Sequence, residues 1–113
     1  RVESTIHFYL EAKRVIKDKI IHLKNEGIED VSIYGINHIS EVLYIVLKEL
    51  GLELVSVVEE KKEGEEWFGY KVIGMDEFVK SNTNVLILAS LDKEEIDCFC
   101  KEQEGLKLVI LRE

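Results

Sequence analysis

The residues most able to do chemistry in this sequence follow the first buried strand that the hydrophobic pattern predicts. That strand, residues 31–35, runs into the segment Gly35-Ile36-Asn37-His38-Ile39-Ser40. In a dinucleotide-binding βαβ unit this place carries the pattern G-x-G-x-x-G, whose glycines make the tight turn, admit the pyrophosphate and let helix and strand pack closely. Only the first glycine, Gly35, is kept. The segment therefore predicts a ligand-facing turn at Gly35 that lacks the complete glycine pattern.

The substitutions within this turn limit what it could hold. Asn37 tolerates a left-handed backbone and can cap a following helix, but its side chain crowds the space that a pyrophosphate would enter. Ser40 is small enough for close helix packing, whereas Glu41 in the first helical turn suits the helix dipole and repels an incoming phosphate. A full NAD or FAD site is therefore not expected. A smaller or differently placed ligand, such as a nucleotide or nucleotide-sugar, is compatible with the turn.

Two kinds of polar side chain could complete a site around Gly35. His38, at the mouth of the turn, could be a general base or a hydrogen-bond donor, but no nucleophile, paired carboxylate or metal-ligand cluster accompanies it, which favours a solvent-facing histidine. An acidic residue about 20 positions after the glycines holds a ribose hydroxyl in dinucleotide sites, and Glu59 or Glu60 has that place. The stretch 59–66 contains five glutamates, so such a match is also expected by chance.

A serine after a later predicted strand should return to the same rim. Ser90 could donate a hydrogen bond to a ligand or cap the helix predicted to begin at Asp92, and we favour the cap. The predicted ligand-binding residues are Gly35, Asn37, His38, Ile39, Glu59, Glu60 and Ser90. We assign no catalytic and no metal-binding residue.

The elements that must position this turn alternate along the chain. Strands rich in apolar residues are predicted at 31–36, 52–58, 70–73, 84–89 and 106–111, with helices at 39–50, 75–81 and 92–103. Such alternation is typical of a parallel sheet covered on both faces. We therefore predict an α/β fold with a Rossmann-like open, mainly parallel sheet of about five strands.

The stretch 59–70 is polar and acidic, and we predict a surface loop there. Its two adjacent aromatic residues, Trp67 and Phe68, either form a flap over the ligand crevice or pack against the sheet edge, and packing is the commoner arrangement. Cys98 and Cys100 lie two positions apart in a predicted helix, where their side chains diverge and cannot easily form a disulfide. We expect buried or half-buried thiols.

A long amphipathic helix is predicted before the sheet, from about residue 3 to residue 26. Its apolar positions recur in steps of four and three, with Lys13 at the one skipped position, and they are Val2, Ile6, Tyr9, Ile16, Ile20 and Leu23. This heptad-like stripe fits a helix lying against its own sheet or, as we slightly favour, the seam of a homodimer. We divide the chain into this helix, residues 1–27, and an α/β domain, residues 28–113. Because the helix begins almost at Arg1, we expect further chain to precede it.

Composition limits the classes of protein that fit. The 113 residues suit one domain, and 46% hydrophobic with 34% charged residues predicts a folded chain. A formal net charge of -8 repels a phosphate backbone, so we expect no direct contact with nucleic acid. No apolar run approaches the roughly 20 residues of a membrane span, and no signal peptide is recognisable. We expect a cytoplasmic protein that does not enter a membrane.

Several short motifs, in this order, resemble two known families. They are Ile33-Tyr34-Gly35 with Ser40-Glu41, the strand 52–58 before an acidic pair, Phe68-Gly69-Tyr70-Lys71-Val72-Ile73, Met75-Asp76-Glu77-Phe78, and the segment 84–90. The order is similar to the N-terminal domain of sugar-nucleotide acyltransferases and to the CoA-binding-like domain of polysaccharide-biosynthesis epimerases. The resemblance spans roughly residues 31–111. It implies a nucleotide-binding type of fold, with ligand contacts at Gly35, Asn37, His38, Ile39 and the Glu59-Glu60 pair.

The opening helix carries a second, shorter resemblance. Residues 2–10 are similar to the helix that follows the winged-helix domain in MarR-like regulators associated with exopolysaccharide genes. This resemblance implies the C-terminal sensing and dimerising part of a transcription regulator.

Three functions are compatible with these observations. The favoured one is a non-catalytic domain that binds a nucleotide or nucleotide-sugar at the Gly35 rim and forms a homodimer through its first helix. The second is an enzyme domain of sugar-nucleotide or NAD-dependent metabolism, in which only His38 could supply a catalytic group. The third is an oligomerisation module with a vestigial pocket.

Overall fold

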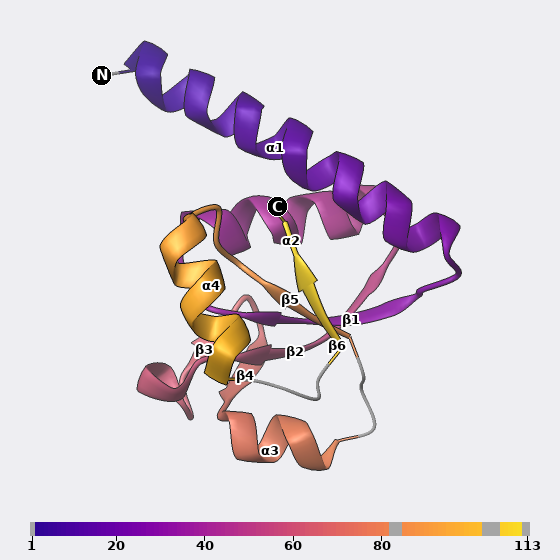
Figure 1. The fold of residues 1–113 in the computed structure, drawn as a ribbon, viewed down its shortest axis with the longest axis vertical. Coiled ribbons are helices and arrows are strands. Elements are labelled where there is room, and N and C mark those ends of the chain that lie inside the picture. Colours follow the sequence, from indigo (N-terminus) through magenta and orange to yellow (C-terminus); the bar gives the residue numbers. More distant parts are fainter. Residues whose placement is uncertain (1, 82–84, 103–106, 112–113) are drawn as a thin grey trace.

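Residues 2–81, 85–102 and 107–111 are described by a computed structural model (Figure 1). The helices are α1 (Val2–Asn25), α2 (His38–Leu50), α3 (Met75–Lys80) and α4 (Lys93–Glu102), with a short 3-10 helix η1 (Glu60–Lys62). The strands are β1 (Asp30–Tyr34), β2 (Glu53–Val58), β3 (Glu66–Trp67), β4 (Tyr70–Ile73), β5 (Val85–Leu88) and β6 (Lys107–Ile110). The ends of three predicted elements, at residues 84, 103 and 106, lie outside the described residues.

The strands form one sheet in the order β3-β4-β2-β1-β5-β6. All neighbours are parallel except β3, which is antiparallel to β4. The chain starts at β1 in the interior, builds outward through β2 to β4, and then crosses to β5 and β6 on the other side of β1. The predicted α/β fold, mainly parallel sheet and N-terminal helix are confirmed, and the sheet has one strand more than predicted.

Helices cover both faces of this sheet (Figure 1). Because successive side chains of a strand point to opposite faces, β5 serves two cores at once. Val85 and Ile87 pack with α1 and α2, in what we call the α1/α2 core. Leu86 and Leu88 pack with α3 and α4, in the α3/α4 core.

The second half of α1 belongs to the domain. Its buried apolar side chains are Ala12, Ile16, Ile20 and Leu23. Lys13, the skipped position of the predicted stripe, binds α2 of its own chain through a 2.9 Å ion pair with Glu49. Lys24 Nζ donates to the carbonyl oxygen of Leu50 at 2.6 Å. This half of the helix therefore lies against its own domain, which was one of the two predicted arrangements.

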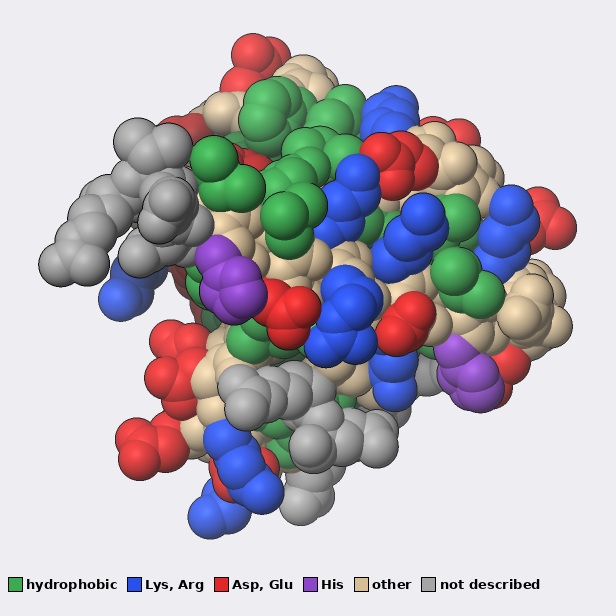
Figure 2. Space-filling view, turned by 90° about the horizontal axis from the view of Figure 1, so that it is seen from above, with side chains coloured by type: hydrophobic (Ala, Val, Ile, Leu, Met, Phe, Trp, Pro, Cys, Tyr) green, Lys and Arg blue, Asp and Glu red, His purple; other side chains and the backbone are tan. Residues whose placement is uncertain are grey.

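The first half of α1 differs, because large apolar side chains are exposed on it. Ile6 is 52%, Phe8 49% and Leu10 58% exposed. Figure 2 looks onto the α1 side of the molecule and shows hydrophobic side chains gathered there, with charged side chains around them. The second half of α1 thus has one buried face, whereas the domain covers the first half only in part.

The prediction of a surface loop over 59–70 was wrong in part. Trp67 ends β3 and is buried in the α1/α2 core. Phe68 and Gly69 form a two-residue turn to β4, with φ of 48° and 85°, as in a type I′ hairpin. Phe68 is exposed and stacks on Tyr44 of α2, with ring centroids 5.0 Å apart. A strand of two residues next to several glutamates leaves too short an apolar pattern to be recognised.

Two further sequence expectations have clear outcomes. Cys100 is half-buried as expected, but Cys98 is exposed, because it lies on the solvent side of α4 while Ile96 and Phe99 face the core. Within the described ranges, none of the helices combines the length and the apolar character that crossing a membrane requires.

Candidate functional site

The Gly35 turn lies where β1 ends and the chain leaves for α2. Gly35 has φ 104°, a left-handed backbone that favours glycine. Its N–H donates to the carbonyl oxygen of Val58 at 2.9 Å, which ties the turn to the end of β2. A Cβ at this position would stand 3.6 Å from Asn37 Nδ2 and 3.7 Å from the Ala89 Cβ, which is ordinary contact. Backbone conformation, rather than space for a ligand, accounts for this glycine.

Asn37 caps α2, as the sequence predicted. Its Oδ1 accepts hydrogen bonds from the N–H groups of Ile39 at 2.8 Å and Ser40 at 3.1 Å. The Ser40 hydroxyl accepts in return from the Asn37 N–H at 2.8 Å, which completes a capping box. The free N–H groups of a helix start are the donors that bind a phosphate. Here Asn37 occupies two of them.

The same asparagine also bridges the two central strands. Its Nδ2 donates to the carbonyl oxygen of Ala89, just after β5, at 3.0 Å. Open parallel sheets bind ligands between the strand ends at which the chain changes sides, which in this sheet are the ends of β1 and β5. The Asn37–Ala89 hydrogen bond therefore spans the place where such sheets bind their ligands.

The two neighbours of Asn37 point in different directions. His38 begins α2 with its side chain 90% exposed, and its Nδ1 lies 3.8 Å from Glu41 Oε1. This is the solvent-facing position that the sequence favoured. Ile39 is half-buried and packs against the α1/α2 core. The helix start thus separates these two predicted ligand contacts.

The acidic pair lies at the end of β2, beside the α3/α4 core. Glu59 caps the short helix η1, with its carboxylate accepting from the Lys61 N–H at 3.4 Å, and Glu60 is exposed. Burial raises the pKa of Tyr34, and the charges of Glu59 and Glu60 raise it further. The negative charges of both carboxylates therefore act on the Tyr34 hydroxyl.

Ser90 begins the turn into α4. It is buried, and its hydroxyl donates to Glu95 Oε1 at 2.7 Å and accepts from the Asp92 N–H at 3.0 Å. Asp92 Oδ1 accepts from the N–H groups of Glu94 and Glu95, so Asp92 caps the helix and Ser90 supports it. The hydroxyl is therefore used by the fold, but the cap of α4 is Asp92 and not Ser90, which the sequence had favoured.

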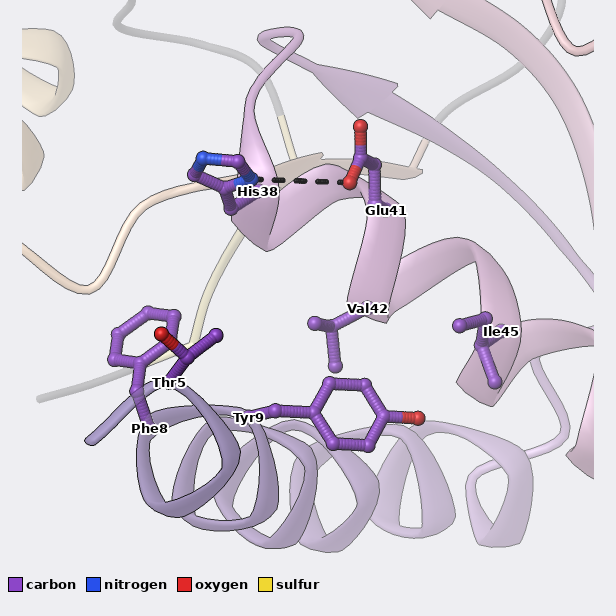
Figure 3. A pocket seen from close by; sticks show the side chains of 7 residues that line it. All are labelled: Thr5, Phe8, Tyr9, His38, Glu41, Val42 and Ile45. Atoms are coloured by element: carbon purple, nitrogen blue, oxygen red, sulfur yellow. Dashed lines mark ion pairs between the residues drawn. The ribbon is translucent and has the colours of Figure 1, made fainter. Parts of the chain in front are cut away.

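A hollow that the sequence analysis missed lies between the first half of α1 and the start of α2. We call it the α1/α2 wedge. It has a volume of about 480 Å³, and its walls are Thr5, Phe8, Tyr9, His38, Glu41, Val42 and Ile45. In Figure 3, Val42 and Ile45 point toward Tyr9, whereas the His38 ring and the Glu41 carboxylate lie on the side away from α1. The interior is therefore apolar and the polar groups stand at the rim.

Three apolar residues off the predicted stripes were the available signal for this region. Phe8 and Leu10 interrupt the heptad-like pattern of the first helix, and Ile45 lies off the apolar face of the second. Ile45 is 38% exposed. Apolar side chains outside the face that meets the core are the feature of the sequence that sets this region apart.

Comparisons with protein-family models, curated proteins and solved structures found no match. In the described part of the chain, no three His, Cys, Asp or Glu side chains group so as to hold a metal ion. Nor does any buried side-chain nitrogen or oxygen there lack a hydrogen-bond partner. The fold and the site together define an α/β domain with two features. The polar side chains of the turn after β1 form hydrogen bonds within the domain, and an apolar wedge lies beside the N-terminal helix.

Proposed function

We propose that this chain is a non-catalytic dimerisation domain in which the first half of α1 pairs two copies. The observation that carries the proposal is the exposure of Ile6, Phe8 and Leu10 on a helix whose second half is fixed in the core. Anchoring gives this apolar segment a defined position. A second copy that covers this segment would remove its apolar surface from water, which stabilises the dimer by about 25 cal/mol for each Å² buried.

The arrangement of these side chains around the helix supports burial by a partner. Successive helix residues are about 100° apart, so Ile6, Phe8, Tyr9 and Leu10 point to several sides of α1. A helix that is apolar on all sides is normally surrounded by other elements. The domain itself covers only one of these sides.

Charge supports the same location for the contact. The whole chain carries a net charge of -8, so two copies repel each other over most of their surfaces. Residues 4–10 contain no Asp, Glu, Lys or Arg. Two copies can therefore meet at this segment without desolvating like charges.

We further propose that the domain is the C-terminal regulatory part of a transcription regulator, because the likeness of the opening helix to MarR-like regulators implies that place. The order β4-β2-β1-β5-β6 matches that of Rossmann-type domains, which supports a Rossmann-like assignment. A homodimer would also match the two-fold symmetry of operator DNA.

Sedimentation velocity of the chain over a range of concentrations tests the dimer. We expect a concentration-dependent dimer that Leu10→Asp converts to a monomer with unchanged circular dichroism. Val79→Asp is the matched control, because Val79 is also 58% exposed but lies on α3, which covers the opposite face. A wild-type chain that stays monomeric at all concentrations would refute the proposal.

Ligand binding at the Gly35 rim is a second candidate, favoured by the change of sides between β1 and β5. A phosphate could reach the N–H groups of Ile39 and Ser40 only by displacing the Asn37 side chain. Thermal unfolding with a panel of nucleotides and nucleotide-sugars tests this in the wild type and in Asn37→Gly. We expect a larger rise in melting temperature in the variant, and no rise in either protein would eliminate this candidate.

A further inference from the structure

We propose that the dimer is interlocked: Ile6 and Leu10 of each copy enter the α1/α2 wedge of the other. This inference rests on the proposed dimerisation and specifies its geometry. Phe8 and Tyr9 of one copy, together with Val42 and Ile45, would cover the partner's inserted side chains.

Ile6 and Leu10 form a stripe that is free to insert. They are four residues apart and therefore lie one above the other on the same side of α1. Both are more than half exposed, and neither lines the wedge of its own chain. The stripe is thus available to a partner while the wedge beside it stays open.

The size and chemistry of the wedge suit side chains from a helix. A two-turn helix segment fills on the order of 850 Å³, from a diameter of about 10 Å and a pitch of about 5.4 Å. The wedge, at about 480 Å³, is too small for the helix itself but large enough for side chains from one of its faces. Its walls around Val42 and Ile45 are apolar, as the stripe is (Figure 3).

Charges beyond the apolar contact are complementary as well. The stripe of Ile6 and Leu10 continues along the same side of α1 to Arg14 and Lys17, which stand four and seven residues after Leu10. Arg14 forms a 3.4 Å ion pair with Glu11 of its own chain, so Lys17 is the basic side chain that the stripe offers to a partner. At the rim of the wedge stands Glu41, whose side chain is 55% exposed. An inserted stripe would therefore bring the basic side chain of Lys17 toward an acidic rim, with apolar side chains meeting apolar walls.

Symmetry completes the case for a second copy as the occupant. Stripe and wedge share one short segment of α1, so a single two-fold operation satisfies both at once. Such an isologous contact uses the same surface twice and closes after two subunits. The interlock thus predicts dimers and no larger assembly.

Disulfide mapping tests this geometry in a chain without its native thiols, Cys98→Ser/Cys100→Ser. Leu10→Cys and Ile45→Cys are introduced together, and the oxidised protein is analysed by non-reducing electrophoresis and peptide mass spectrometry. A disulfide requires Cα atoms within about 7 Å of each other. We expect a covalent dimer in which position 10 of one copy is linked to position 45 of the other. The control, Leu10→Cys with Val79→Cys, should give no link between positions 10 and 79.

The outcomes separate this inference from the dimerisation proposal. Links only between positions 10 and 10, or a link from 10 to 45 within one chain, would overturn the interlock while sedimentation still shows a dimer. No covalent dimer together with a monomer in sedimentation would overturn both. As an independent readout, Ile45→Asp should weaken dimerisation on the order of tenfold or more, since a carboxylate would be buried in the contact. An unchanged dissociation constant in that variant would contradict the interlock.

Discussion

Replacing Asn37 by Ala should reveal how much the closed strand-end turn contributes to stability. The substitution removes two hydrogen bonds that cap α2, from Ile39 and Ser40, and the bond from Nδ2 to the Ala89 carbonyl oxygen. Loss of an N-cap costs about 1 kcal/mol. Loss of a further hydrogen bond costs about 1 kcal/mol. We therefore expect the free energy of unfolding to fall by about 2 kcal/mol.

Urea unfolding followed by tryptophan fluorescence measures this change. The chain has one tryptophan, Trp67, which is buried in the α1/α2 core and reports on the packing beside α2. At about 4 °C per kcal/mol for a domain of this size, the melting temperature should fall by about 8 °C.

A conservative variant separates the two contributions. Asn37→Asp keeps an oxygen that can cap the helix, and its charge suits the helix dipole, but it cannot donate to the carbonyl oxygen of Ala89. It should lose about half as much stability as Asn37→Ala. A loss below about 0.5 kcal/mol in the alanine variant would refute the whole argument. Equal losses in the two variants would show that the bond to Ala89, rather than the cap, accounts for the effect.

Three other perturbations have expected outcomes. Ser32 is fully buried and its hydroxyl lies 2.7 Å from that of Ser56, so Ser32→Ala should cost about 1 kcal/mol and the double alanine variant little more, as a double-mutant cycle in urea would show. Burial raises the pKa of Tyr34 most, and the charges of glutamates raise it further. The stability that the neutral Tyr34 hydroxyl contributes is therefore fully present below the ordinary tyrosine pKa of about 10 and is lost as pH rises through the raised value. The urea midpoint should therefore fall over that alkaline range in the wild type and less in Tyr34→Phe, and equal slopes would contradict the assignment. Phe68→Gly removes the strain of a left-handed backbone, a gain of about 1 to 2 kcal/mol. It also loses the stacking on Tyr44, a cost of about 0.5 to 1.5 kcal/mol. The free energy of unfolding, measured by a thermal melt, should therefore change by less than about 1.5 kcal/mol.

Local signals were enough to predict most of the elements. The glycine at position 51 marks the end of α2, where it adopts φ 79°, and the run 52–58 gave β2 to within one residue. The cap at Asn37 was also predictable, because its partners are two and three residues away. Each of these features depends on residues close together in the sequence.

The rest depends on residues that are distant in the sequence. The Asn37–Ala89 hydrogen bond joins residues 52 positions apart, so no local pattern predicts that the turn is closed. The wedge depends on the angle between α1 and α2. Contacts between these helices, among them the Lys13–Glu49 ion pair, hold them at this angle. Seen alone, the heptad-like stripe of α1 could not indicate that half of it meets its own domain.

The unequal division of the apolar side chains between the two faces of the sheet has a dynamic consequence. Most buried residues lie in the α1/α2 core, whereas α4 is held to the sheet by two, Ile96 and Phe99. Local opening costs least where few apolar contacts are broken, so amide hydrogens of α4 should exchange with solvent before those of α2. The α1/α2 core would then be the last part of the domain to open, and the buried second half of α1, which anchors the proposed contact segment, would stay in place in partly open forms of the domain.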